Sequence, residues 1–164
     1  MKIYIQIASY RDPQLINTVR DCIENADSPE DLVFGICLQR DIENGEQQDF
    51  LDVYNDDDRF RIIDVDHNKA KGVCWARNAV QQNYKGEEYT LQLDSHHRFV
   101  KGWDTKCIEM IHQLESDGYE KPLLTSYIPS FDPDNDPQSR VQVPWKMNFD
   151  RFIPEGAIFF LPGL

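Results

Sequence analysis

Short apolar segments alternate with amphipathic segments through the first two thirds of the chain, and this alternation limits the choice of fold more than any other feature. The apolar segments predict buried strands at residues 3–7, 32–38, 60–65 and 89–93. Apolar residues at three- and four-residue intervals predict helices over residues 13–26, 48–54, 72–82 and 103–114. Strands that alternate with helices are typical of an α/β protein with a mostly parallel sheet flanked by helices.

The pattern changes after residue 120. We expect a strand over residues 123–127, a polar surface loop over 129–144 and a final strand over 157–161. An EF-hand at Asp132, Asp134 and Asp136 is excluded, because its sixth position lacks glycine and its twelfth is Val143. At the other end of the chain, Asp12 and Pro13 predict the N-cap and first turn of a helix.

Charge and composition exclude several classes of partner. The 164 residues carry a net charge of −12, which disfavours nucleic acid, where basic patches supply the affinity. No apolar run reaches the length of a membrane span, so we expect no membrane insertion. The four cysteines lie in apolar contexts without zinc-ligand spacing, which predicts buried free thiols and a cytoplasmic location: Cys22, Cys37, Cys74 and Cys107.

Polar residues follow each predicted strand, at the edge of an α/β sheet where ligands usually bind. In chain order they are Ser9, Tyr10 and Arg11; Gln39 and Arg40; Asp64, Asp66, Lys69, Lys71 and Gly72; and Asp94 and His96. These side chains suit a nucleoside diphosphate held with a metal ion. Neither a P-loop nor a dinucleotide-binding Gly-x-Gly-x-x-Gly motif is present.

The triplet Asp94-Ser95-His96 is the candidate metal site. On an extended backbone alternate side chains share a face, so Asp94 and His96 would face one cation, with Ser95 turned aside. A carboxylate suits Mg²⁺ or Mn²⁺, and an imidazole shifts the preference toward Mn²⁺. The alternative is a solvated turn in which Asp94 caps the next helix. Several neighbours also have structural alternatives: an ion pair for Arg11, a packing role for Tyr10, and plain surface positions for Arg77, His67, His97 and His112.

The ordered set of motifs resembles a known family of GlcNAc glycosyltransferases, which includes cytoplasmic transferases acting on hydroxyproline. The segments are Ile-Ala-Ser-Tyr-Arg-Asp-Pro (7–13), Phe-Gly-Ile-Cys-Leu-Gln (34–39), Lys-Gly-Val-Cys-Trp-Ala-Arg-Asn (71–78), residues 87–99 and Gly-Trp-Asp (102–104). The Asp-Ser-His triplet is also similar to that of polypeptide GalNAc transferases. This resemblance implies a GT-A fold in a single domain, residues 1–164. Residues 1–120 would bind the nucleotide-sugar and residues 121–164 would begin the acceptor side.

The resemblance also implies roles for individual residues. Asp94 and His96 would hold Mn²⁺ (or Mg²⁺) on the diphosphate of a UDP-sugar, by analogy UDP-GlcNAc, and Asp94 and Arg77 would be catalytic. The nucleotide-sugar would contact Ala8, Ser9, Tyr10, Arg11, Gln39, Asp66, Lys71, Gly72, Arg77, Asp94 and Ser95. Among these, Gln39 and Asp66 are candidates to bind uracil. The acceptor would be a hydroxyl group of a protein or a glycan.

Two other functions stay open at this point. One is a non-catalytic module that binds UDP-sugar, and the other is a metal-dependent phosphohydrolase using the same Asp94 and His96. Transferases with this triplet commonly draw a further metal ligand from a later region, yet no histidine follows His112. Either water or phosphate supplies that ligand or, as we expect, the chain is the amino-terminal part of a longer transferase.

Overall fold

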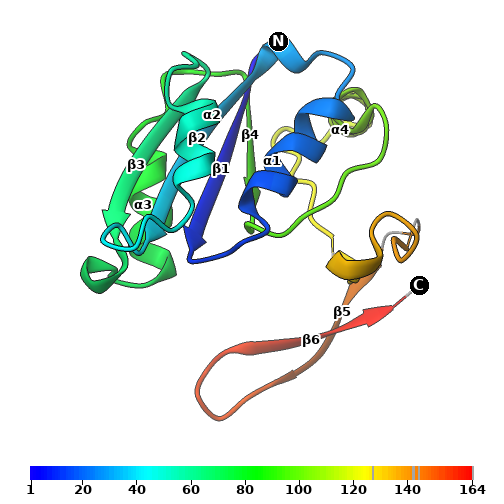
Figure 1. Cartoon of the computed structure of the whole chain (residues 1–164). Helices are drawn as coiled ribbons and strands as arrows, with labels where there is room; N and C mark the ends of the chain where they lie inside the picture. Colours follow the sequence, from blue (N-terminus) through cyan, green and yellow to red (C-terminus); the bar gives the residue numbers. More distant parts are fainter. Residues whose placement is uncertain (127, 142, 144, 164) are drawn as a thin grey trace. The chain divides into compact units, whose positions relative to one another are not determined.

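The computed structural model of the chain describes residues 1–126, 128–141, 143 and 145–163. Contacts divide it into two compact units, residues 1–104 and 105–164. The first unit contains β1 (Ile3–Tyr10), α1 (Leu15–Glu24), η1 (Pro29–Asp31), β2 (Leu32–Arg40), α2 (Gln48–Tyr54), β3 (Phe60–Asp66), η2 (His67–Lys69), α3 (Val73–Gln81) and β4 (Tyr89–Leu93) (Figure 1). The predicted α/β class with a parallel sheet flanked by helices is confirmed.

The four strands are parallel and lie in the order β3-β2-β1-β4. The chain first adds β2 and β3 on one side of β1, and then returns to place β4 on the other side. In open α/β sheets this reversal is a topological switch point, and ligands bind beyond the carboxyl ends of the strands there. The fold therefore places the expected ligand site between the ends of β1 and β4.

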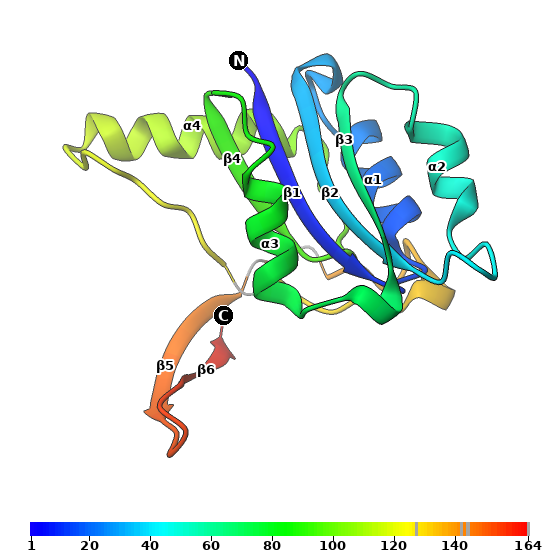
Figure 2. The same ribbon diagram turned by 90° about the vertical axis from the view of Figure 1, so that its left-hand side faces the viewer.

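Helix α3 covers one face of the sheet, while α1 and α2 cover the other (Figure 2). Under α3 the core consists of Tyr4, Val33, Cys37, Ala76 and Val80. The Tyr4 hydroxyl donates a hydrogen bond of 2.7 Å to the carbonyl of Val80 and so joins β1 to α3. Gly35 makes room for this ring, because a Cβ atom there would lie 1.9 Å from the Tyr4 oxygen.

Aromatic contacts join α2 to the opposite face of the sheet. The rings of Phe34 and Phe60 stack across β2 and β3 at 4.7 Å between centroids. Tyr54 stacks on Phe60 at 4.5 Å, and Phe50 in turn contacts Tyr54 at 4.9 Å. These contacts explain why the short helix predicted over residues 48–54 forms at that position.

The strands extend further toward the ligand edge than the apolar pattern predicts. β1 continues to Tyr10, β2 to Arg40 and β3 to Asp66, since main-chain pairing continues past the last apolar side chain. The predicted N-cap at Asp12 is wrong, because α1 begins at Leu15 and Gln14 occupies the N-cap position.

The second unit holds most of α4 (Trp103–Ser116), η3 (Pro133–Asn135) and the antiparallel pair β5 (Lys146–Phe152) and β6 (Ile158–Gly163). The predicted strand at 157–161 corresponds to β6. The one predicted at 123–127 is wrong for residues 123–126, which have no strand partner, and residue 127 lies outside the described residues. No helix within the described ranges is long and apolar enough to cross a membrane.

Candidate functional site

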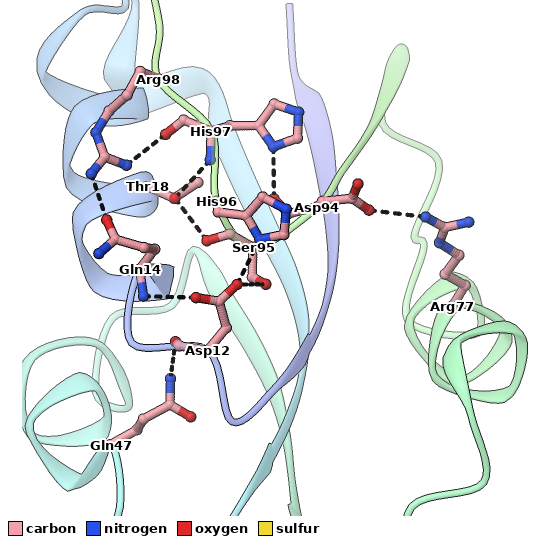
Figure 3. Close-up of polar contacts among 10 residues, drawn as sticks. All are labelled: Asp12, Gln14, Thr18, Gln47, Arg77, Asp94, Ser95, His96, His97 and Arg98. Atoms are coloured by element: carbon pink, nitrogen blue, oxygen red, sulfur yellow. Dashed lines mark hydrogen bonds and ion pairs between the residues drawn. The ribbon is translucent and has the colours of Figure 1, made fainter. Parts of the chain in front are cut away.

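Two loops flank the switch point of the first unit. One follows β1 and leads through Asp12 into α1, and the other follows β4 and contains the Asp94-Ser95-His96 triplet. Residue Ile7 of β1 pairs in register with Leu93 of β4, so the two loops leave adjacent strands at the same edge. Figure 3 shows that their side chains meet in one polar cluster.

Asp12 lies at the centre of this cluster. Its Oδ1 accepts a hydrogen bond of 2.9 Å from the backbone N–H of Gln14. Its Oδ2 accepts one of 2.6 Å from the Ser95 hydroxyl and lies 2.7 Å from Nδ1 of His96. The Asp12 carbonyl also accepts a hydrogen bond of 2.7 Å from Nε2 of Gln47. The carboxylate is therefore fixed from both sides and joins the two loops.

The environment of Asp12 keeps its carboxyl ionised. Only 18% of its side chain is exposed. Burial by itself raises the pKa of Asp12, but the hydrogen bonds from Ser95, His96 and the Gln14 N–H outweigh it, and the net effect lowers the pKa. Asp12 thus presents a negative charge to the His96 ring.

Asp94 and His96 lie on the surface of the cluster and contact different partners. Their side chains are 57% and 59% exposed. Asp94 Oδ1 lies 3.1 Å from Nη2 of Arg77, whereas His96 contacts Asp12. Ser95 is buried, unlike its two exposed neighbours, and its hydroxyl reaches the same Asp12 oxygen as His96. β4 ends at Leu93, so strand alternation does not extend into the triplet.

Helix α1 holds the loop after β4 in place. The buried Thr18 hydroxyl donates to the Ser95 carbonyl at 2.8 Å and accepts from the His97 N–H at 3.0 Å. Oε1 of Gln14 accepts from Arg98 at 2.7 Å. His97, expected on the surface, is half-buried, and burial lowers its pKa. The backbone of the triplet is therefore anchored, while the heads of Asp94 and His96 face outward.

Several residues expected to bind nucleotide are buried or paired in this structure. Gln39 Nε2 donates to the carbonyl of Ser9 at 3.1 Å, and both residues are buried. The Ser9 hydroxyl has no hydrogen-bond partner among the described residues. Arg11, at a φ of 50°, pairs with Glu46 at 3.0 Å, as its structural alternative predicted. Tyr10 is exposed, so it does not pack on the core edge.

The remaining candidates lie along the same edge. Asp64 pairs with the buried Arg40 through two hydrogen bonds, of 2.8 and 2.9 Å. Asp66 accepts a hydrogen bond from the backbone N–H of residue 68, which lowers its pKa. Lys71 lies over the Trp75 ring, with Nζ 5.8 Å from the centroid. Ala8 packs against the core under α3, and Gly72, at a φ of 90°, precedes the first turn of that helix.

The donor set at the triplet fits a divalent cation that takes its other ligands from elsewhere. Asp94 offers a carboxylate, and His96 offers Nε2 because its Nδ1 is engaged by Asp12. Across residues 1–126, 128–141, 143 and 145–163, no group of three or more His, Cys, Asp or Glu side chains is arranged to hold a metal. A metal at the triplet would therefore need further oxygen ligands, such as phosphate or water.

Fold and site together define an α/β protein with its polar cluster at the switch point of a parallel sheet. The chain matches the family described as Glycosyltransferase (GlcNAc) over residues 2–52 and 43–161. It therefore belongs to this family of glycosyltransferases, and the resemblance seen in the motifs is confirmed. No curated protein and no solved structure gave a significant match.

Sequence reasoning missed the two residues that organise the site. Asp12 was assigned only to a helix cap, and Thr18 was not counted among the residues of the apolar stripe although it lies on the buried face of α1. Asp12 directly follows β1, and β1 lies beside β4. This position would have identified Asp12 as a site residue, but only once the strand order is known. Thr18 left a weaker signal, as a polar residue within an otherwise apolar helix face.

Proposed function

We propose that this glycosyltransferase uses UDP-GlcNAc and a divalent cation, most suitably Mn²⁺, and transfers GlcNAc to a hydroxyl group of a protein or a glycan. The observation that carries the proposal is the outward-facing pair of Asp94 and His96 on an anchored loop at the switch point. The GT-A form of the α/β fold is part of the same proposal. Membership of the family supports transfer chemistry, and the donor set supports the metal.

In the proposed reaction, Asp94 and His96 would hold the cation, which when bound neutralises charge on the departing diphosphate. Arg77 pairs with Asp94 at 3.1 Å and so stands beside the place where that charge develops. Its guanidinium would donate hydrogen bonds to the diphosphate oxygens. The exposed Tyr10, together with Lys71 and Gly72 at the start of α3, would line the donor at the same edge.

The uridine would lie over the ends of β1 and β2. Ser9, Gln39 and Asp66 are the proposed contacts. Ser9 and Gln39 are buried in this structure, so their side chains would have to turn toward the sheet edge to reach a ligand. The Ser9 hydroxyl has no hydrogen-bond partner among the described residues, which leaves it available for such a contact. Arg11 would leave Glu46 to approach the nucleotide; their contact is partly exposed, and exposed ion pairs are weak. The predicted burial of all four thiols is wrong for Cys74, which is exposed, and for Cys107, which is only half-buried. We also propose a cytoplasmic location, which the buried thiols Cys22 and Cys37 support.

Calorimetric titration with UDP-GlcNAc, with and without Mn²⁺, tests the proposal. We expect wild type to bind the donor tightly only with Mn²⁺, and Asp94→Ala to lose that dependence. Asp56→Ala is the matched control, since it removes an exposed carboxylate from the turn after α2. UDP-glucose in place of UDP-GlcNAc tests the sugar.

Product analysis separates transfer from the alternatives. Release of UDP from UDP-GlcNAc in the presence of an acceptor or water supports a transferase. Donor binding without any UDP release would favour a non-catalytic module. Release of inorganic phosphate from UDP would favour a phosphohydrolase. Absence of Mn²⁺-dependent binding in folded wild type would refute the assigned donor site.

A further inference from the structure

One oxygen of the largely buried Asp12 carboxylate contacts the exposed side chain of His96. Its Oδ2 lies 2.7 Å from Nδ1 of His96, and the His96 side chain is 59% exposed. Exposed ion pairs and hydrogen bonds contribute little to stability. The contact therefore has its main effect on the orientation of the imidazole.

We propose that Asp12 is the residue that positions His96 as a metal ligand. This inference rests on the proposed function, in which Asp94 and His96 hold a divalent cation. A carboxylate only accepts hydrogen bonds, so Nδ1 of a neutral His96 must carry the proton that it shares with Asp12. Nε2 is then left with a free lone pair, which is the form that binds a metal.

Asp12 is suited to this role because it is itself held firmly. The N–H of Gln14 fixes Oδ1, the Ser95 hydroxyl fixes Oδ2, and Gln47 fixes the backbone carbonyl. These contacts come from the loop after β1, the loop after β4 and the start of α2. The orientation of His96 is thus set by the packing of the unit and not by its own loop alone (Figure 3).

The test variant is Asp12→Asn, which keeps the shape of the side chain but offers one acceptor oxygen. That oxygen can accept hydrogen bonds either from the Gln14 N–H or from Ser95 and His96, but not from both sides. The amide nitrogen of the new side chain would then lie against another hydrogen-bond donor. Asp104→Asn is the matched control. It neutralises another buried aspartate, which accepts hydrogen bonds from two consecutive backbone N–H groups at 2.8 and 2.9 Å.

Mn²⁺ binding is measured by the electron paramagnetic resonance signal of free Mn²⁺ at pH 8, without nucleotide and with UDP. Loss of a residue that orients a metal ligand typically weakens metal binding about 10- to 100-fold. We expect a loss of this size for Asp12→Asn and none for Asp104→Asn, even if both variants melt at lower temperature. An Asp12→Asn variant that is folded and binds Mn²⁺ as wild type does would overturn the inference and leave the proposed function standing.

Nitrogen-15 NMR of histidine side chains gives a second readout on metal-free wild type. The inference requires His96 to carry its proton on Nδ1, and His96→Gln assigns the signal. A proton on Nε2 would overturn the inference even if Asp12→Asn fails to fold. If wild type binds no Mn²⁺ under any condition, the proposed function fails and the assignment of His96 as a ligand fails with it. The two failures are therefore distinguishable.

Discussion

Replacing Thr18 by valine removes the hydroxyl that joins α1 to the loop after β4 while keeping the size of the side chain. Thr18 is fully buried, and its oxygen makes hydrogen bonds of 2.8 Å to the Ser95 carbonyl and 3.0 Å from the His97 N–H. Leaving a buried polar group without a partner costs about 1–3 kcal/mol. Since the Ser95 carbonyl and the His97 N–H both lose their partner, we expect Thr18→Val to lower the free energy of unfolding by about 2–6 kcal/mol.

Thr18→Ser is the control, because it keeps the oxygen and removes one methyl group, at a cost of about 1 kcal/mol. Urea unfolding followed by tryptophan fluorescence gives both free energies. Hydrogen exchange of the His97 amide gives the local effect: protection should fall in Thr18→Val and persist in Thr18→Ser. Equal stability of the two variants, or an unchanged His97 exchange rate in Thr18→Val, would show that the hydroxyl does not hold the loop.

Three further predictions concern other parts of the first unit. Gly35→Ala places a Cβ atom 1.9 Å from the Tyr4 hydroxyl oxygen, so urea unfolding should show a loss of about 2–5 kcal/mol, and Tyr4→Leu should cost less in that background than in wild type. Burial raises the pKa of Glu87, but the hydrogen bonds from Arg61 and from the Lys85 N–H, together with the Arg61 charge, outweigh this and hold the pKa below the ordinary value of 4.5. Stability from this pair is therefore present above pH 4.5 and lost as the pH falls through the folded-state pKa, and acid titration of Glu87→Gln should show a smaller loss. Burial raises the pKa of the Cys37 thiol to about 11, so Ellman's reagent at pH 8 should modify Cys37 only after unfolding; modification of the native protein would contradict this.

The local sequence pattern alone was enough to predict most helices and strands of the first unit. The helix at residues 48–54 and the strand at 89–93 have the predicted bounds, because apolar periodicity and turn residues mark both ends of each. The predicted strands for β1 and β2 ended too early. Their last residues are polar yet continue the main-chain pairing: Ser9, Tyr10, Gln39 and Arg40. A ladder depends on the neighbouring strand, which the segment itself does not specify.

The second unit was predicted less well for the same reason. β5 alternates polar and apolar residues only from Lys146 to Asp150, the alternation ends at Arg151, and its seven residues are all exposed. It forms because it pairs with β6, from Lys146 opposite Gly163 to Phe152 opposite Ile158. Leu123 and Leu124 are apolar but have no strand beside them, so their apolar character gave a wrong prediction.

The candidate site was predicted in part. The motifs located the loop that carries Asp94 and His96, and the family match agrees with the transferase class. How these residues are held was not predictable from their own segment. The bond from Ser95 to Asp12 spans 83 positions in the sequence, and that from Thr18 to Ser95 spans 77. Such contacts follow from strand order, which the order of motifs along the chain does not reveal.

The placement of β4 beside β1 also has a consequence for synthesis of the protein. During translation, β1, β2 and β3 are made first and can pair with one another in order of appearance. The edge of β1 that pairs with β4 then stays unpaired until residues 89–93 have been made. Asp12 consequently has neither Ser95 nor His96 to bind in a nascent chain that ends before them. A ribosome-bound intermediate of this kind would expose the unpaired edge of β1. Unpaired strand edges are sites where chaperones bind and where aggregation begins.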